Sequence, residues 1–260
     1  MRFFLALAAA ACALALTGCA SLSDPEPAEV ALPYVKTFST NEAGDGLPEG
    51  WKPWGVNRFK RPTEYRLVND AGRTVIRARA SSSASGLVHT LDLDPSVYQL
   101  LQWRWKVDEL IAKADNTQKS TEDSPVRLVV SFDGDHEKLD FSDRMFFDQI
   151  RAFTGQQLPY ATLMYIWENR VPKGTIIPNR HTGRIKMIVA ESGRDKLGSW
   201  QEQQHNIYED FRRAFGEEPG RIIAVGIMTD TDNTGENTHA YYGDIAFKRI
   251  AQPRVVLGSD

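Results

Sequence analysis

The sequence predicts a mainly β protein, a jelly-roll-like β-sandwich with two accessory α-helices. Three observations support this fold class. Many short runs with strand-like composition are separated by turn signals. Apolar and polar residues alternate in the clearest of these runs, which is the pattern of a strand with one face on a core. Only two segments have the helical spacing of apolar residues.

The predicted strands follow one another along nearly the whole chain. In the run YQLLQWRWKV, apolar side chains alternate with Gln102, Arg104 and Lys106. The run VRLVVSFD repeats the pattern, with Arg127, Ser131 and Asp133 on its polar side. Such alternation suits antiparallel sheets packed face to face. The predicted strands cover residues 34–39, 64–69, 73–80, 85–92, 98–107, 126–133, 160–168, 184–190, 221–230 and 239–250.

Two helices are expected between the strands. In the segment 199–216, Ser199 and Glu202 have the spacing of a capping box, and Gly216 provides a stop. Its predicted apolar stripe consists of Trp200, Ile207, Phe211 and Ala214, with a Glu209–Arg213 pair. The segment 142–155 is a weaker candidate, with Met145, Phe146, Ile150 and Phe153 on one side. The loops 112–124 and 169–183 are polar and are expected to be exposed.

The N-terminus has the features of a lipoprotein signal. Arg2 precedes an apolar run that is too short to span a membrane, and Leu16-Thr17-Gly18-Cys19 resembles the bacterial lipobox. We therefore expect a signal peptide over residues 1–18 and a lipid on Cys19. Ala20 follows the cysteine where inner-membrane retention signals carry aspartate, which favours the outer membrane. The predicted order is then a flexible tether over residues 19–33, one sandwich domain over 34–252 and a tail over 253–260.

Composition excludes several classes of function. The chain has 260 residues, a net charge of −3 and no basic run, so nothing favours nucleic acid as a partner. Of its two cysteines, Cys12 lies in the predicted signal peptide and Cys19 is the predicted lipid site, which leaves the domain without a thiol nucleophile or a thiolate metal site. The five histidines lack metal-ligand spacing, and no serine-hydrolase elbow or phosphate-binding loop occurs. No catalytic residue is assigned.

The segment TDTDNTGENTH contains the main metal candidate. Asp230 and Asp232 lie close together before Gly235, and hard cations such as calcium prefer clustered oxygen ligands. An EF-hand is ruled out because Tyr241 stands where the loop requires glutamate. A turn in which Asp and Asn cap the backbone is the favoured interpretation. A calcium ion bound by Asp230, Asp232 and Asp244 is the alternative.

Polar residues of the strands suggest a binding surface. Asp244 lies within an apolar strand, and a carboxylate there must be solvated, paired or bound to a ligand. If the polar strand faces coincide, they form a surface for a polar ligand, and a solvated, charge-paired face is an equally strong alternative. The candidate ligand-binding residues are Arg104, Asp133, Glu168, Tyr242 and Asp244.

Several motifs resemble a known bacterial family of exported proteins. The order of WRWKV, RLVVSFDGD, TLMYIWEN, YEDFRRAFGEEP and IMTDTDNTG followed by AYYGDI is similar to domain of unknown function family 3047. The resemblance spans residues 34–250. It implies an exported, β-rich protein, and it implies no activity and no catalytic residues. The late GDI strand is also similar to jelly-roll sugar-binding modules.

The sequence therefore favours a non-catalytic envelope lipoprotein that binds a polar ligand, such as an envelope glycan, and faces the periplasm from the outer membrane. A polysaccharide hydrolase or lyase is the alternative, and a structural or assembly lipoprotein is the third hypothesis. Apart from the possible calcium ion, no cofactor is expected.

Replacing the cysteine of the lipobox tests the anchor. We expect Cys19→Ser to move the protein from the membrane fraction to the soluble fraction, because each buried methylene of an acyl chain adds about 0.8 kcal/mol of membrane affinity. Fractionation of cell envelopes measures the change, and Cys12→Ser is the control that should stay anchored. Retention of the Cys19→Ser protein on membranes would contradict the prediction.

Overall fold

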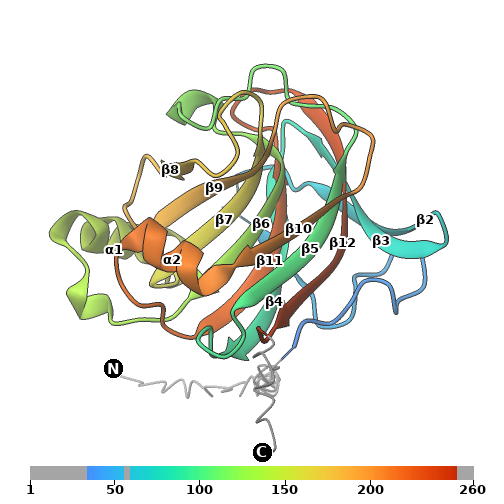
Figure 1. The fold of residues 1–260 in the computed structure, drawn as a ribbon. Coiled ribbons are helices and arrows are strands. Elements are labelled where there is room, and N and C mark those ends of the chain that lie inside the picture. Colours follow the sequence, from blue (N-terminus) through green and yellow to red (C-terminus); the bar gives the residue numbers. More distant parts are fainter. Residues whose placement is uncertain (1–33, 56–58, 251–260) are drawn as a thin grey trace, which may run out of the picture.

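The computed structural model describes residues 34–55 and 59–250, which form two β-sheets packed face to face (Figure 1). The prediction of a jelly-roll-like β-sandwich with two helices is confirmed. The predicted signal, Cys19, the tether and the tail at 253–260 lie outside the described residues and stay predictions. Within the described ranges, no helix is long and apolar enough to cross a bilayer.

One sheet has seven strands in the order β1-β4-β11-β6-β7-β9-β8. Neighbours pair antiparallel except β7 and β9, which pair parallel. The strands are β1 (Lys52–Gly55), β4 (Ala84–Leu93), β6 (Ser124–Phe132), β7 (Ala161–Glu168), β8 (Ile176–Pro178), β9 (Ile185–Ser192) and β11 (Ile222–Asp230).

The other sheet has five antiparallel strands in the order β10-β5-β12-β3-β2. They are β2 (Glu64–Asp70), β3 (Arg73–Ser81), β5 (Leu100–Val107), β10 (Gln201–Asn206) and β12 (Asn237–Lys248). Two short 3-10 turns cover Lys119–Thr121 and His136–Lys138.

Strand alternation builds the core between the sheets, as predicted. On β5, every second side chain is buried, including Trp103 and Trp105. On β6, the side chains of Leu128 and Val130 enter the same cluster. Burying these large apolar side chains is the main favourable contribution to folding. The alternate residues of β6, among them Arg127, consequently face the other side of their sheet.

Nine of the ten predicted strands are present, and the first is wrong. Residues 34–39 form an irregular segment instead of a strand. Phe38 anchors this segment in the core, with its ring 4.8 Å from that of Trp51. The short strands β1 and β8 were missed because each has only three or four residues and contains proline.

Helix α1 (Phe141–Thr154) agrees with the weaker helical prediction, but its buried side differs. Asp140 caps its start by accepting a hydrogen bond from the amide of Asp143. Phe147 is the phenylalanine that enters the core, whereas Met145 and Phe153, which were predicted to share an apolar side, are 47% and 86% exposed. The helix therefore packs over the edge of the sandwich through one face only.

The predicted helix 199–216 is half wrong. Its first part is the edge strand β10, which pairs with β5, and helix α2 covers only Ile207–Phe215. Asn206 is the N-cap, accepting from the amide of Glu209 at 3.1 Å, so no capping box forms at Ser199. The ring of Trp200 lies outside the helix. Ile207 and Phe211 are buried as predicted, but Arg213 pairs with Asp210 rather than with Glu209.

A β-bulge changes the predicted faces of β12. The register to β5 shifts between Tyr242 and Ile245, so both of these side chains point into the core, while Asp244 points outward. Gly243 leaves room for the side chain of Arg104, because a Cβ there would lie 2.4 Å from Nε of Arg104 and displace it. Strict alternation along AYYGDIAF predicts that Tyr242 and Asp244 share one face, and the bulge makes this prediction wrong.

Asp244 holds the N-terminal segment on the sheet. Its carboxylate accepts hydrogen bonds from the amides of Phe38 at 2.7 Å and Ser39 at 3.0 Å, and from the Ser39 hydroxyl at 2.5 Å. The residue that was predicted to bind a ligand thus has a structural role in this fold.

We expect Asp244→Ala to lower the free energy of unfolding by about 1–3 kcal/mol, because two backbone donors and one hydroxyl lose a charged acceptor. Urea denaturation measures the loss. Asp133→Ala is the matched control, since the side chain of exposed Asp133 accepts, among the described residues, only from the amide of its neighbour Gly134. Equal stability of the two variants would contradict the role assigned to Asp244.

Candidate functional site

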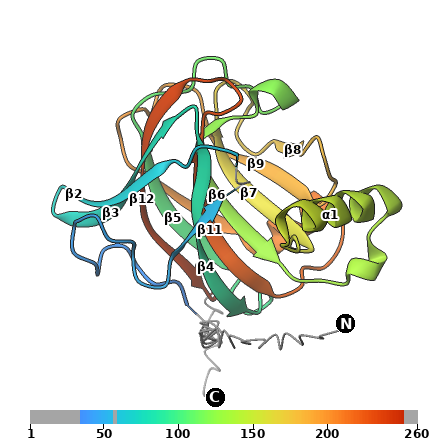
Figure 2. The ribbon, with the colours of Figure 1, turned by 180° about the vertical axis from the view of Figure 1, so that it is seen from behind.

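A groove with a volume of about 520 Å³ opens on the outer face of the seven-stranded sheet. Figure 2 shows this sheet with helix α1 beside it. Strands β4, β6, β7 and β11 form the floor, while α1, the segment after it and β1 form the sides. The groove follows from the fold, because α1 covers only one margin of the sheet.

Small and apolar side chains form the floor of the groove. On β11, the outward positions are Ala224, Gly226, Met228 and Asp230, while Val225 and Ile227 are buried in the core. Neighbouring strands add Val129, Ser131, Thr162, Met164, Ala84 and Val88. The small side chains leave a hollow above the sheet.

Aromatic and apolar side chains line the two sides. Trp54 of β1 lies over Gly86, where a Cβ would come within 3.0 Å of its ring. On the opposite side, Phe146 and Ile150 of α1 face the groove, and the ring of Phe146 stacks at 5.9 Å on that of His181. The groove therefore combines apolar walls with an uncovered floor.

Charged residues gather at one end of the groove. They come from the ends of β6 and β11 and from the loops beside them. Three are basic and three are acidic: Lys60, Lys119, Arg127, Glu122, Asp230 and Asp232. A fourth carboxylate, that of Asp123, lies beside those of Asp230 and Asp232.

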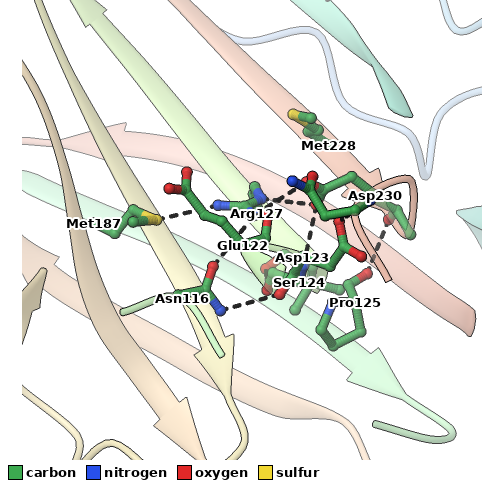
Figure 3. A network of polar contacts seen from close by, with 12 residues as sticks. Asn116, Glu122, Asp123, Ser124, Pro125, Arg127, Met187, Met228 and Asp230 are labelled. Atoms are coloured by element: carbon green, nitrogen blue, oxygen red, sulfur yellow. Dashed lines mark hydrogen bonds and ion pairs between the residues drawn. The ribbon is translucent and has the colours of Figure 1, made fainter. Parts of the chain in front are cut away.

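A buried ion pair between Arg127 and Asp230 organises the charged end (Figure 3). Nε and Nη2 of Arg127 donate to the two carboxylate oxygens of Asp230 at 2.8 and 3.1 Å. The two side chains are only 3% and 6% exposed. Asp230 also accepts from the amide of Ser124 at 3.1 Å. The pair links β6 to β11.

Burial raises the pKa of Asp230 to about 6, and the charge of Asp123 adds to the rise, although Arg127 lowers it. Burial alone would lower the pKa of Arg127, but the charges of Asp230, Glu122 and Asp123 hold it above its ordinary value. Each charge is thus retained in the interior because its partner is present.

The five predicted ligand-binding residues do not share one surface. Arg104 and Asp244 lie on the outer face of the five-stranded sheet, where the guanidinium of Arg104 is 4.4 Å from the ring of Trp200. Tyr242 is buried between the sheets. Glu168 is buried at the end of β7, and Asp133 is exposed at the end of β6.

Two of these residues satisfy backbone groups instead. Tyr242 donates to the carbonyl of Met228 at 2.6 Å and accepts from the amide of Arg127 at 3.2 Å. Glu168 accepts from the amides of Arg170 and Val171 at 2.7 and 3.1 Å. A ligand at either side chain would have to replace these bonds.

The acidic cluster differs from the predicted calcium set by one residue. Asp230 and Asp232 converge with Asp123, and one carboxylate oxygen from each lies within 4.8 Å of the others. Asp244 is occupied by the N-terminal segment. Asp123 accepts from the amides of Asn233 and Thr234 at 3.2 and 2.7 Å, so it caps the loop after β11. The interpretation of this loop as a capped turn agrees with these contacts.

Sequence reasoning missed the residues that complete the groove. Glu122 and Asp123 fall in the loop 112–124, which was expected to be exposed, yet Asp123 is fully buried. Trp54 belongs to a strand of four residues with no usable period. A signal for the floor was available, since Ala224, Gly226 and Met228 alternate with larger core residues.

Comparison with protein families identifies one match. A family model described as a protein of unknown function, DUF3047, matches residues 49–246. No curated protein sequence matches the chain.

Solved structures with similar folds include two carbohydrate-binding modules from Clostridium thermocellum. The family 11 module of cellulase Lic26A-Cel5E is 9% identical, with a TM-score of 0.43 over 86% of this chain and 99% of that one. The family 30 module of cellulase Cel9D-Cel44B is 10% identical, with a TM-score of 0.36 over 86% and 96%. The endo-1,4-β-glucanase CelB2 is also 10% identical, with a TM-score of 0.38 over 75% and 90%.

A melting experiment tests the calcium hypothesis. Because Arg127 and Lys60 already pair with Asp230 and Asp232, and Asp123 caps a loop, we expect the same melting temperature with calcium and with a chelator. Magnesium serves as the control cation. A rise in melting temperature with calcium that Asp232→Asn abolishes would contradict this expectation and support a bound ion.

Proposed function

The chain belongs to the DUF3047 family, and we propose that its sandwich is a non-catalytic domain that binds a glycan in the groove of the seven-stranded sheet. We further propose that a lipid on Cys19 holds this domain at the bacterial outer membrane, facing the periplasm. The observation that carries the binding role is the open groove of about 520 Å³.

The size and lining of the groove support a ligand. Pockets for small ligands generally measure about 300–1,000 Å³ and combine apolar walls with a few polar groups. Here Trp54 and Met228 provide apolar surface, while Arg127 and Glu122 provide polar groups at one end. A sandwich face without a ligand would bring these apolar side chains into contact with water.

The chemistry of a sugar chain fits this lining. Each sugar ring has an apolar face of C–H groups and a rim of hydroxyl groups. The C–H face suits the ring of Trp54 and the flat floor at Ala224 and Gly226. The hydroxyl rim suits Ser131 and Thr162 and the charged end of the groove.

A polysaccharide hydrolase is the second candidate, favoured by one observation. The pKa of Asp230 is raised by burial, as in many general acids, and a second carboxylate, that of Asp232, lies close to it. Both oxygens of Asp230, however, already accept hydrogen bonds from Arg127. This geometry favours binding without catalysis. Release of new reducing ends from envelope polysaccharide by the purified protein would instead favour the hydrolase.

Filling the groove tests the binding role. We expect Ala224→Phe to weaken glycan binding by tenfold or more, about 1.4 kcal/mol, because the new ring occupies the floor. Affinity of the purified protein for envelope glycans measures the change. Ala246→Phe is the matched control, since Ala246 lies on the five-stranded sheet and lines no part of the groove. Equal glycan affinity of the two variants would reject the groove as the binding site.

A further inference from the structure

One terminal nitrogen of the buried guanidinium, Nη1, has no oxygen partner among the described residues. Nε and Nη2 of Arg127 donate to oxygens of Asp230, Asn116 and Glu122. Nη1 donates only to Sδ of Met187, at 3.2 Å, among the residues that the structure describes. A thioether sulfur is a weak acceptor, and buried donors are normally satisfied by oxygen. The side chain is 3% exposed and lines the groove.

A carboxylate lies beside this donor. The backbone carbonyl of Glu122 accepts from Nη2 of Arg127 at 2.9 Å, which fixes the residue next to the guanidinium. Within the described ranges, its side chain accepts a hydrogen bond through one oxygen only, from Nδ2 of Asn179 at 3.1 Å. Figure 3 shows this carboxylate on the Met187 side of the guanidinium, away from Asp230. The end of the groove thus places a donor and an acceptor next to each other.

The charges around this pair restrict the ligand. Basic and acidic residues are interspersed at this end, and the carboxylate of Asp123 lies beside those of Asp230 and Asp232. A ligand carboxylate next to Arg127 would be repelled by the negative charge of Glu122. A ligand ammonium next to Glu122 would be repelled by the positive charge of Arg127. A hydroxyl group both donates and accepts, so two neighbouring hydroxyls match the pair without adding a charge.

We propose that Nη1 of Arg127 and the carboxylate of Glu122 form a subsite for two neighbouring hydroxyl groups of a neutral sugar. One hydroxyl accepts from Nη1, and the other donates to Glu122. The inference rests on the proposed glycan-binding function and adds the class of glycan. Trp54 and the small floor residues then hold the ring faces, while this subsite sets the orientation of the chain.

Three β-1,4-linked hexasaccharides of different charge test the proposal on the purified full chain by calorimetry. Mannose gives the neutral probe, mannuronate the acidic one and glucosamine the basic one. We expect the neutral chain to bind about tenfold more tightly than either charged chain. Its affinity should also stay constant when salt rises from about 50 to 500 mM, because no ligand charge is screened.

Substitutions locate the subsite. Glu122→Ala should weaken binding of the neutral chain about tenfold, because one hydroxyl loses its acceptor. Glu202→Ala, an exposed strand residue of the other sheet, is the matched control and should not change it. Arg127→Lys keeps a positive charge near Asp230 but removes the Nη1 donor, and we expect a similar loss of affinity. Since this variant risks unfolding, its melting temperature is measured alongside.

Each outcome decides between the two proposals. Tighter binding of the acidic or basic chain, with Ala224→Phe still blocking it, would overturn the neutral subsite and leave groove binding intact. Unchanged affinity of the neutral chain for Glu122→Ala would also overturn the subsite. Failure of all three probes to bind would overturn both the subsite and the glycan-binding function.

Discussion

The ion pair between Arg127 and Asp230 is the constraint on which the groove end depends. Removing two charges from water costs several kcal/mol for each ion, and only good geometry and further hydrogen bonds offset that cost. The structure provides both, because Asp230 receives two donors from the guanidinium and one from Ser124. Arg127 in turn fixes Asn116 and Glu122. The charge pair therefore helps to place the loop 112–123, together with Glu168, which accepts from the amide of Asn116 at 3.1 Å.

The pairing between β6 and β11 is irregular in the same region, and two tyrosines of the other sheet form hydrogen bonds with backbone groups there. The register between β6 and β11 shifts near Pro125, which has no amide hydrogen. Tyr242 reaches across the core to bond the amide of Arg127 and the carbonyl of Met228. Tyr65 accepts from the amide of Thr229 at 3.0 Å. Burial raises the pKa of both tyrosines, so their hydroxyls stay neutral. The bulge and the ion pair thus depend on one network that joins the two sheets.

The sequence was informative where a local pattern decides the structure. Alternation predicted β5 and β6, because a strand between a core and an outer face needs that period. It failed for β10, where the polar run QEQQHN has good helix formers and becomes a strand only by pairing with β5. Alternation also failed at Gly243. The bulge adds one residue to β12, so the side chains after it point to the opposite faces from those that strict alternation with the residues before it would give. The contact between Asp230 and Arg127 joins residues 103 positions apart, which no local pattern reveals.

The outer face of the seven-stranded sheet shows why the groove is better explained by a ligand than by folding alone. A sheet face in water is normally polar, and an apolar one is normally covered by helices. Here Val129, Met164 and Met228 are apolar, yet α1 packs only along one margin through Phe147. Gly226 lets β11 lie close to β4, because a Cβ there would be 3.0 Å from the carbonyl oxygen of Leu87. Ala224 is different, since a larger apolar residue there would bury more apolar surface in the groove. Small floor residues, an aromatic side wall and an incompletely bonded arginine are together the features of a surface shaped for a bound molecule.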